Sequence, residues 1–357
     1  MAMALKAVNV CDVPNLDQVP ENAALALCST RFRAGVNDDK ICECNIPKFL
    51  VVGHRGNGMN MLQSPDPRMK SIKENSIISF NEAAKFSIDF IEFDVQVTKD
   101  DNPVIYHDNF ILHEEKGVIV ENRVTELALA EFLSYGPQKH PGSEGKPLYR
   151  KTKDGRFFEW KVEKDAPLCT LEEAFRNVDQ SVVFENAKGR QILFSSFQPD
   201  AARLIRKLQS AYPVYFLTNG GSEIYRDIRR NSLEEAIKLS LENGLQGIVS
   251  EVKAVFRNPG AVGRIKESKL SLMTYGQLNN VPEVVYMQHL MGVEGVIVDL
   301  IKEISESVSD LTHAKEGEEK SLYGEEDGKK EVKAKPQFSK DELSFLLKLI
   351  PELMIQA

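Results

Sequence analysis

Strand-like and helix-like segments alternate at a regular rhythm along the second half of the sequence. Short apolar runs typical of buried strands are separated by longer stretches whose apolar residues have helical spacing. Because strands that alternate with helices form repeated βα units, the pattern predicts an α/β fold with a parallel sheet. Parallel barrels carry their chemistry at the carboxyl ends of the strands. The predicted strands are 192–197, 214–217, 247–252, 270–275 and 293–298, and the predicted helices are 199–210, 232–243, 260–267 and 281–291.

The first half shows the same alternation, interrupted by one irregular stretch. From about 109 to 167 the sequence is rich in Gly, Pro and charged residues. We interpret this stretch as an insertion or capping subdomain on one rim of the scaffold. Before and after it, strands are predicted at 48–53, 90–97 and 104–106, and helices at 76–87 and 170–178.

The two ends of the sequence lack this rhythm. Residues 1–46 show no sustained period and are expected to form an extended arm, whereas 47–302 hold the scaffold. The stretch 303–338 is highly charged, which predicts a solvated linker. A helix that opens with a capping box is predicted within 339–357, and its apolar face could dock on the scaffold or contact a partner helix or a membrane surface.

Charge and cysteine usage exclude several classes of protein. With 45 Lys and Arg against 53 Asp and Glu the net charge is −8, so no binding to nucleic acid is expected. No apolar run approaches the ~20 residues that span a bilayer. The five cysteines form no disulfide framework, and Cys42 and Cys44 lack a second Cys or His pair at zinc spacing. We therefore expect an intracellular, reducing location, and the sequence does not distinguish the cytoplasm from a plastid.

Two carboxylates and two imidazoles stand at the predicted strand ends. Glu92 and Asp94 are two residues apart on a strand, so both side chains leave the same face. Buried carboxylates need a cation or hydrogen bonds, and oxygen ligands favour Mg²⁺ or Ca²⁺ over zinc. His54 follows the first strand, and His107 closes the extension of the second. Two imidazoles suit phosphodiester cleavage, in which one takes a proton from the attacking oxygen and the other gives one to the leaving oxygen, while Arg55 can hold phosphate.

This set of residues resembles the glycerophosphodiester phosphodiesterase family, and its soluble plant branch most of all. The resemblance covers about 48–302. The stretches that carry it are Gly53-His54-Arg55-Gly56, Glu74-Asn75-Ser76, Ile91-Glu92-Phe93-Asp94-Val95, Val104 through Asp108, Thr170-Leu171-Glu172-Glu173-Ala174, Phe194-Ser195-Ser196-Phe197 and Gly292 through Asp299.

The resemblance implies a TIM barrel, a (β/α)8-type α/β fold, with an insertion after the second strand. It also implies metal-dependent hydrolysis of a small glycerophosphodiester, such as glycerophosphocholine, to sn-glycerol 3-phosphate and an alcohol. A neighbouring glycerol hydroxyl could attack first, giving a cyclic phosphate that water then opens. By match, the acid-base pair would be His54 and His107, the substrate-binding residues Arg55 and Glu74, and the ligands of Mg²⁺ or Ca²⁺ Glu92 and Asp94.

The sequence departs from the family at the third strand. The family motif there is similar to Ile-Glu-Leu-Lys, whose Glu completes the metal site and whose Lys helps to hold phosphate. It belongs before the 194–197 strand, yet the interval 179–190 is too short for a strand and its crossover. Glu185 and Glu251 are candidate substitutes for the missing Glu, but each has the wrong spacing or belongs to the wrong strand. We therefore expect a barrel that lacks one βα unit and has impaired chemistry.

Two other functions stay open at this point. The lost unit would favour a non-catalytic or regulatory isoform, which calorimetric titration with a divalent ion would separate from an enzyme. A phospholipase D-like lipid phosphodiesterase on the same barrel would instead cleave intact phospholipid and bind vesicles through the C-terminal helix.

Overall fold

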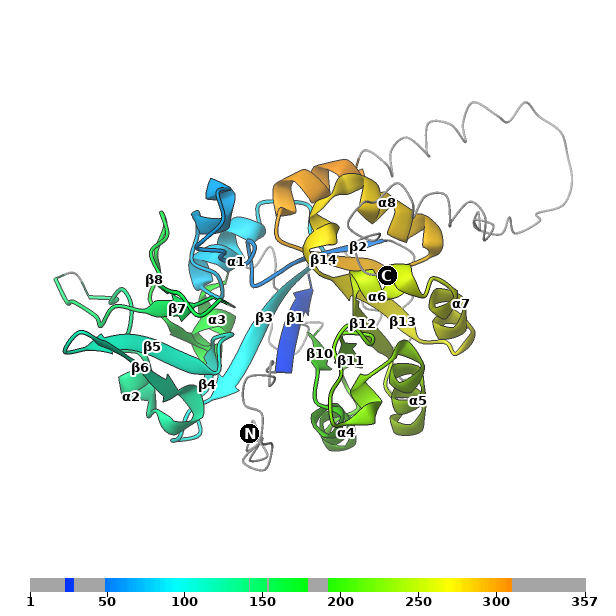
Figure 1. Cartoon of the computed structure of the whole chain (residues 1–357), viewed down its shortest axis with the longest axis horizontal. Coiled ribbons are helices and arrows are strands. Elements are labelled where there is room, and N and C mark those ends of the chain that lie inside the picture. Colours follow the sequence, from blue (N-terminus) through cyan, green and yellow to red (C-terminus); the bar gives the residue numbers. More distant parts are fainter. Residues whose placement is uncertain (1–22, 29–48, 141, 153, 179–191, 310–357) are drawn as a thin grey trace, which may run out of the picture.

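The computed structural model describes the backbone of residues 23–28 and, with their side chains, residues 49–140, 142–152, 154–178 and 192–309. A curled sheet carries most of the helices on its outer side, and a smaller sheet lies beside it (Figure 1). Among these residues, no helix is long and apolar enough to cross a membrane.

The main sheet is built from parallel strands whose bounds lie within two residues of the predicted ones. Each strand is hydrogen-bonded to the next in the order β10-β11-β12-β13-β14-β2-β3, and β14 pairs with β2 so that Val298 lies opposite Gly53. This order gives the α/β barrel arrangement that the sequence predicts. The strands are β2 (Leu50–Gly53), β3 (Phe90–Val97), β10 (Ile192–Ser196), β11 (Val214–Thr218), β12 (Gly247–Glu251), β13 (Ser271–Tyr275) and β14 (Gly295–Val298).

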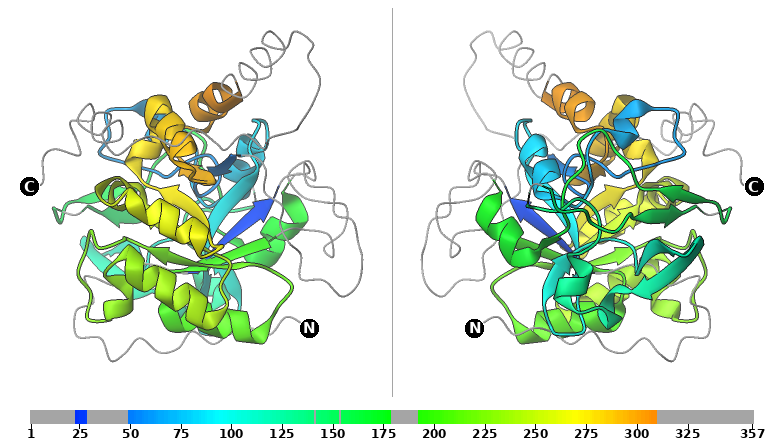
Figure 2. Two further views of the ribbon diagram at one scale, coloured as in Figure 1. Left: turned by 90° about the vertical axis from the view of Figure 1, so that its right-hand side faces the viewer. Right: turned by 90° about the vertical axis from the view of Figure 1, so that its left-hand side faces the viewer.

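An antiparallel strand lies between β3 and β10, the two end strands of the parallel series. β1 (Ala23–Cys28) pairs antiparallel with β3 on one side and with β10 on the other, with Ala24 opposite both Asp94 and Ser195. It thereby closes the barrel between those two strands (Figure 2). In the described parts of the chain no parallel strand lies there, and residues 179–191, which precede β10, are outside them. That one βα unit is missing stays a prediction. The segment expected to be an extended arm, 1–46, thus contributes a barrel strand.

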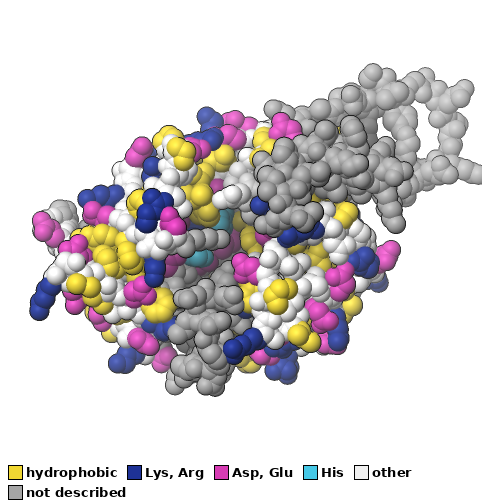
Figure 3. Space-filling view, viewed as in Figure 1, with side chains coloured by type: hydrophobic (Ala, Val, Ile, Leu, Met, Phe, Trp, Pro, Cys, Tyr) yellow, Lys and Arg dark blue, Asp and Glu magenta, His cyan; other side chains and the backbone are white. Residues whose placement is uncertain are grey.

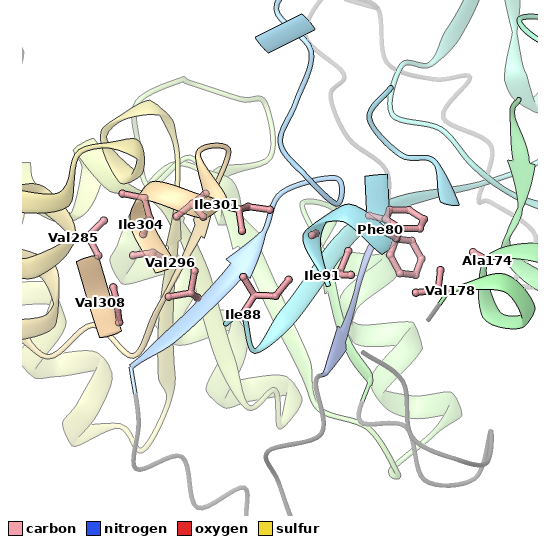
Figure 4. Packing of buried hydrophobic residues seen from close by; sticks show 14 of the residues in the cluster. Phe80, Ile88, Ile91, Ala174, Val178, Val285, Val296, Ile301, Ile304 and Val308 are labelled. Atoms are coloured by element: carbon pink, nitrogen blue, oxygen red, sulfur yellow. The ribbon is translucent and has the colours of Figure 1, made fainter. Parts of the chain in front are cut away.

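Side chains along each strand point alternately into and out of the barrel, which gives an inner and an outer apolar layer. Leu50, Val52 and Phe90 pack inside the barrel, together with residues of β11, β12 and β13. Ile91 belongs to the outer layer, where buried side chains of the strands meet those of the helices (Figure 4). Because side chains alternate between the faces of a strand, Glu92 and Asp94 share the inner face with Phe90, as the sequence predicts.

Helices follow most strands and begin and end at recognisable caps. The side chain of Ser232 accepts a hydrogen bond from the backbone of Glu235 at the start of α5, which ends at Gly244 in the left-handed conformation. Thr170 and Glu173 form a capping box at the start of α3. The helices are α1 (Ile77–Ala83), α2 (Leu129–Phe132), α3 (Leu171–Asn177), α4 (Pro199–Leu208), α5 (Leu233–Asn243), α6 (Val252–Arg257), α7 (Gly260–Glu267) and α8 (Pro282–Met291).

The insertion has regular structure that its composition did not predict. It carries an antiparallel sheet in the order β6-β5-β7-β8, and its buried cluster includes Tyr106, Phe132 and Trp160. This sheet lies beside the barrel (Figure 1). The strands of this region are β4 (Pro103–Ile105), β5 (Phe110–Glu115), β6 (Val118–Arg123), β7 (Tyr149–Lys151), β8 (Phe157–Glu159) and β9 (Cys169–Thr170), of which β4 pairs with β3 and β9 with β4.

The barrel also continues further toward the C-terminus than predicted. Residues 301–309 are helical, and Ile301, Ile304 and Val308 are buried in the outer layer (Figure 4). The prediction of a solvated linker from 303 is therefore wrong over 303–309, because apolar residues at helical spacing sit among the charges. The rest of that linker, the C-terminal helix, the pair Cys42 and Cys44, and Glu185 lie outside the described residues.

Candidate active site

His54 is held by a carboxylate from the neighbouring strand. It directly follows β2, and Asp299 directly follows β14, so the parallel pairing of these strands brings the two side chains together. His54 Nδ1 lies 2.7 Å from Asp299 Oδ1, and Asn280 donates a hydrogen bond to Asp299 Oδ2 at 3.0 Å. Burial alone would lower the pKa of His54, but the Asp299 carboxylate outweighs it and the pKa is raised. Asp299 stands in the last stretch of the family resemblance, where no role was predicted for it. The available signal was its position one residue past a strand that neighbours β2.

His107 has the same arrangement with a different aspartate. Its Nδ1 lies 2.7 Å from Oδ1 of Asp108, the next residue in the chain. Burial would raise the pKa of Asp108, but Arg150 and His107 together hold it well below its usual range. An ionised carboxylate only accepts hydrogen bonds, so His107 Nδ1 is the donor. Both predicted histidines are thus oriented through Nδ1 by a carboxylate.

Glu92 and Asp94 form a buried carboxylate pair on β3, less than a tenth exposed each. The backbone N–H of Arg55 donates to Glu92 Oε2 at 3.0 Å, and His54 Nε2 lies 4.0 Å from the same oxygen. Asn75 donates from Nδ2 to Asp94 Oδ2 at 2.8 Å and accepts from the backbone of Asp94 at 3.2 Å. Burial and the nearby Asp94 raise the pKa of Glu92 to about 7. The pair is therefore short of positive charge.

Arg55 connects this pair to Glu74. Its Nη1 donates to Glu74 Oε1 at 2.7 Å, and its Nε lies 3.5 Å from Asp94 Oδ2. Arg55 has a φ of 51°, and the following Gly56 has a φ of 89°, so the turn after β2 depends on left-handed backbone. A Cβ at Gly56 would lie 2.5 Å from Ser79 Oγ and 2.8 Å from the Phe80 ring, so the turn packs directly on α1.

Glu74 is the centre of the site's charge network. Its side chain has no exposed surface, and Oε1 accepts from Arg55 and, at 2.5 Å, from Nη2 of Arg150. Oε2 accepts from the backbone of Asn60. Burial would raise the pKa of Glu74, but the two arginines hold it well below its usual range. All six predicted site residues therefore lie in one network, to which the structure adds Asp108, Asp299 and Arg150. In the space-filling view, histidine side chains lie in a hollow next to acidic ones (Figure 3).

The described residues do not contain a complete metal site. They hold no group of three or more His, Cys, Asp and Glu side chains arranged to bind a metal ion. Glu251, a candidate substitute ligand, instead accepts a hydrogen bond from the backbone of Ala254 and caps α6, and it also accepts from Ser222. Within the described part of the chain, the two predicted ligands Glu92 and Asp94 lie next to each other on β3.

Comparison with known proteins identifies the family. The model of the Glycerophosphoryl diester phosphodiesterase family matches residues 54–303. The chain belongs to this family. Its members are phosphoric diester hydrolases, so the chain is a glycerophosphodiester phosphodiesterase in class.

Relatives match along almost the whole chain. The chloroplastic glycerophosphodiester phosphodiesterase GDPD1 of Arabidopsis thaliana is 55% identical, with 99% of each chain covered, and GDPD3 of the same plant is 55% identical, with 94% and 99% covered. The alignment with GDPD1 spans 382 positions against 357 residues here, so at least 25 positions have no residue in this chain. That is the size of a strand with its crossover.

Solved structures share the fold. An Oleispira antarctica phosphodiesterase, in complex with the product sn-glycerol-3-phosphate, has a TM-score of 0.50 at 16% identity, covering 74% of this chain and 97% of its own. A putative glycerophosphodiester phosphodiesterase from Galdieria sulphuraria has the same TM-score and identity, covering 74% and 99%. At this identity the likeness concerns the fold.

Proposed function

We propose that the chain hydrolyses a small glycerophosphodiester, such as glycerophosphocholine, to sn-glycerol 3-phosphate and an alcohol. The observation that carries the proposal is the pair of histidines, each oriented by an aspartate at Nδ1 and both tied to the network of Arg55 and Glu74. The substrate class is supported by the names of the relatives and by the product held in the Oleispira antarctica structure.

In the proposed reaction the two histidines move protons in opposite directions. One takes the proton from the attacking oxygen, either a neighbouring glycerol hydroxyl or water, and the other gives a proton to the leaving alcohol oxygen. If the glycerol hydroxyl attacks first, a cyclic phosphate forms and water then opens it. Arg55 would bind phosphate oxygens. Because Glu74 has no exposed surface, its part would be to hold Arg55 in place.

Glutamine variants of the two histidines test this function. His54→Gln and His107→Gln should each lower kcat for glycerophosphocholine by about 10²–10⁴-fold, since each removes a proton-transfer group. His140, which is exposed in the insertion, provides the matched control His140→Gln, which should leave kcat unchanged. Full activity in either His54→Gln or His107→Gln would refute the assignment.

We also propose that Glu92 and Asp94 bind a divalent cation, Mg²⁺ or Ca²⁺. Mg²⁺ is commonly bound by one or two carboxylates together with substrate phosphate and water, so the pair is a usable but incomplete donor set. When bound, such an ion would neutralise charge that develops on the phosphate. Calorimetric titration with MgCl₂ and CaCl₂ should show weak binding that Asp94→Asn abolishes and the control Glu251→Gln retains. Equal heats in the Asp94→Asn variant would contradict it.

The predicted loss of one βα unit supports a second proposal, that the enzyme activity of this chain is impaired. We expect slow hydrolysis. The described residues supply two candidate metal ligands, Glu92 and Asp94, whereas the family resemblance implies a third from the strand that is predicted to be missing here. A chimera that receives the positions present in GDPD1 and absent here should hydrolyse glycerophosphocholine faster than this chain. Equal rates would show that the unit is dispensable, and no divalent-ion binding at all would favour a non-catalytic isoform.

For location, we propose a plastid, on the likeness to a relative named chloroplastic. A fluorescent-protein fusion to the C-terminus, imaged against chlorophyll autofluorescence, should overlap the plastids. A diffuse cytoplasmic signal would refute the proposal.

A further inference from the structure

Arg150 of the insertion joins two parts of the candidate site, the pair His107 and Asp108 and the pair Arg55 and Glu74. It lies in β7, outside the barrel, yet its Nε donates to Asp108 Oδ2 at 2.9 Å and its Nη2 to Glu74 Oε1 at 2.5 Å. Its Nη1 donates to the backbone oxygen of Asn60 at 3.3 Å. All three nitrogens of the guanidinium are therefore engaged. Asn60 and Glu74 belong to the connection between β2 and α1, and Asp108 follows β4.

Both carboxylates that Arg150 contacts orient a residue of the proposed reaction. Asp108 uses its other oxygen, Oδ1, for the bond to His107 Nδ1 at 2.7 Å. Glu74 uses the same oxygen, Oε1, for Arg55 Nη1 at 2.7 Å and for Arg150. A shift of the Arg150 guanidinium would therefore move the support of a proton-transfer group and of the phosphate-binding group together.

The guanidinium is itself fixed by an aromatic ring of the insertion. Its central carbon lies 3.7 Å from the centroid of the Trp160 ring, and the Arg150 side chain is 12% exposed. Trp160 is buried, and its Nε1 donates to Asn60 Oδ1 at 3.0 Å, so the ring is anchored to the loop whose backbone also receives Arg150. Stacking of a guanidinium on an aromatic face is favourable and sets the plane of its donors.

We propose that Arg150 is a positioning residue that couples His107 to Arg55, and that the insertion is thereby part of the active site. The proposal rests on the proposed function for its kinetic consequence. The geometry requires an arginine, because a planar fork bonds two carboxylates and a carbonyl at once. A lysine ammonium is a single point charge on a flexible stem and cannot hold the same two directions.

The imidazole of His107 provides a readout that does not depend on turnover. In the full chain labelled with ¹⁵N-histidine, the Nδ1 proton of His107 should give a downfield NMR signal, because it is donated to an ionised carboxylate. His107→Gln assigns this signal by its loss. Arg150→Lys should broaden or remove the signal, since Asp108 loses its anchor at Oδ2.

A matched control is available in the same insertion. Arg156 is exposed and pairs with Asp154, so Arg156→Lys changes the same chemical group without touching the site. It should leave the His107 signal, the unfolding midpoint and the activity unchanged. Arg150→Lys keeps a cation beside both carboxylates. It is therefore preferred to a neutral variant, which would leave the buried Glu74 with Arg55 alone and Asp108 with His107 alone.

Kinetics test the coupling between these two parts of the site. With glycerophosphocholine, Arg150→Lys should lower kcat by about 10–100-fold with a smaller change in KM, because alignment of the proton donor acts on the chemical step. Asp108→Asn should lower kcat similarly, and the double variant should be little worse than either single one.

The outcomes separate this proposal from the function it rests on. An Arg150→Lys chain that is folded, as shown by thermal unfolding, and keeps both the His107 signal and wild-type kcat would overturn the positioning role. An additive double variant would overturn the coupling. A wild-type chain without hydrolytic activity would refute the proposed function, while loss of the His107 signal in Arg150→Lys would still support the positioning role.

Discussion

At the scale of single residues, the charged side chains of the candidate site form groups in which each carboxylate has a positively charged or imidazole partner. Glu74 has two arginines, Asp108 has Arg150 and His107, and Asp299 has His54. Burial and the adjacent Asp94 carboxylate raise the pKa of Glu92 to about 7. Removal of one member of such a group leaves an unpaired buried charge and costs more than replacement of the whole group by apolar residues. Neutral single variants at these positions therefore need a folding control.

Lys73 makes a pH-dependent contribution to stability. It is 2% exposed, its Nζ lies 3.9 Å from the Trp160 centroid and 3.3 Å from Asp165, and burial lowers its pKa to about 8. Between pH 8 and the ordinary lysine value near 10.5 the unfolded chain binds more protons at this residue, so its contribution to the free energy of unfolding rises with pH. From pH 8 to 10 the rise should be about 2 kcal/mol.

The measurement is urea unfolding of the wild type and of Lys73→Met at pH 8 and pH 10. The wild type should gain relative to Lys73→Met as the pH rises, because methionine fills a similar volume without a titratable group. A constant difference between the two proteins would contradict the predicted shift.

Gly56 should tolerate no side chain. Gly56→Ala combines a φ of 89° with contacts below 3.0 Å to Ser79 and Phe80, so we expect a loss of about 2–4 kcal/mol in stability. Gly117, with a φ of 82° and open space around it, isolates the cost of the backbone conformation, about 1 kcal/mol. Chemical denaturation measures both. An equal loss at the two positions would mean that the packing of the turn on α1 adds nothing.

At the scale of elements, the helix over 301–309 is part of the barrel's outer layer. Ile304 is fully buried there, so Ile304→Ala should destabilise the chain by about 2–5 kcal/mol, in line with other large-to-small changes in cores. Glu306 is exposed on the same helix, and Glu306→Ala should change stability by less than about 0.5 kcal/mol. If Ile304→Ala unfolds at the wild-type urea midpoint, the packing of this helix does not stabilise the outer apolar layer.

Helices and strands whose apolar residues repeat at a regular spacing could be predicted from the sequence. Elements and residues whose role depends on partners far away in the sequence could not. The parallel strands of the barrel and the helices between them were predicted because they follow strand-like apolar runs or have apolar residues at helical spacing. The histidines were predicted from their places after strands, and the carboxylate pair from its two-residue spacing on one strand. Arg150 stands in a turn-rich basic stretch, and its partners Asp108 and Glu74 lie 42 and 76 residues away, so no local pattern marked it. β1 is a six-residue run whose pairing exists only after the barrel forms.

At the scale of the whole molecule, β1 keeps the barrel closed. Its backbone is hydrogen-bonded on both sides, so deletion of residues 1–28 should expose the edges of β3 and β10. Since each lost hydrogen bond contributes a net ~1 kcal/mol, we expect the thermal midpoint to fall by more than about 5 °C. Deletion of 1–22, which leaves β1 intact, is the matched control. The same midpoint in both truncations, or full amide protection of β3 and β10 without β1, would show that closure contributes no stability.

The position of β1 near the start of the described residues also affects how the barrel can close during synthesis. Ser195, the partner of Ala24, is translated about 170 residues after it, at roughly 5–20 residues per second. For that interval β1 has no complete binding site on its own chain, and the barrel can close only after β10 exists. A finished barrel that has released its own strand offers the same pair of edges to β1 of a second chain. Refolding at high protein concentration should therefore yield strand-exchanged dimers, which dilution before refolding should suppress.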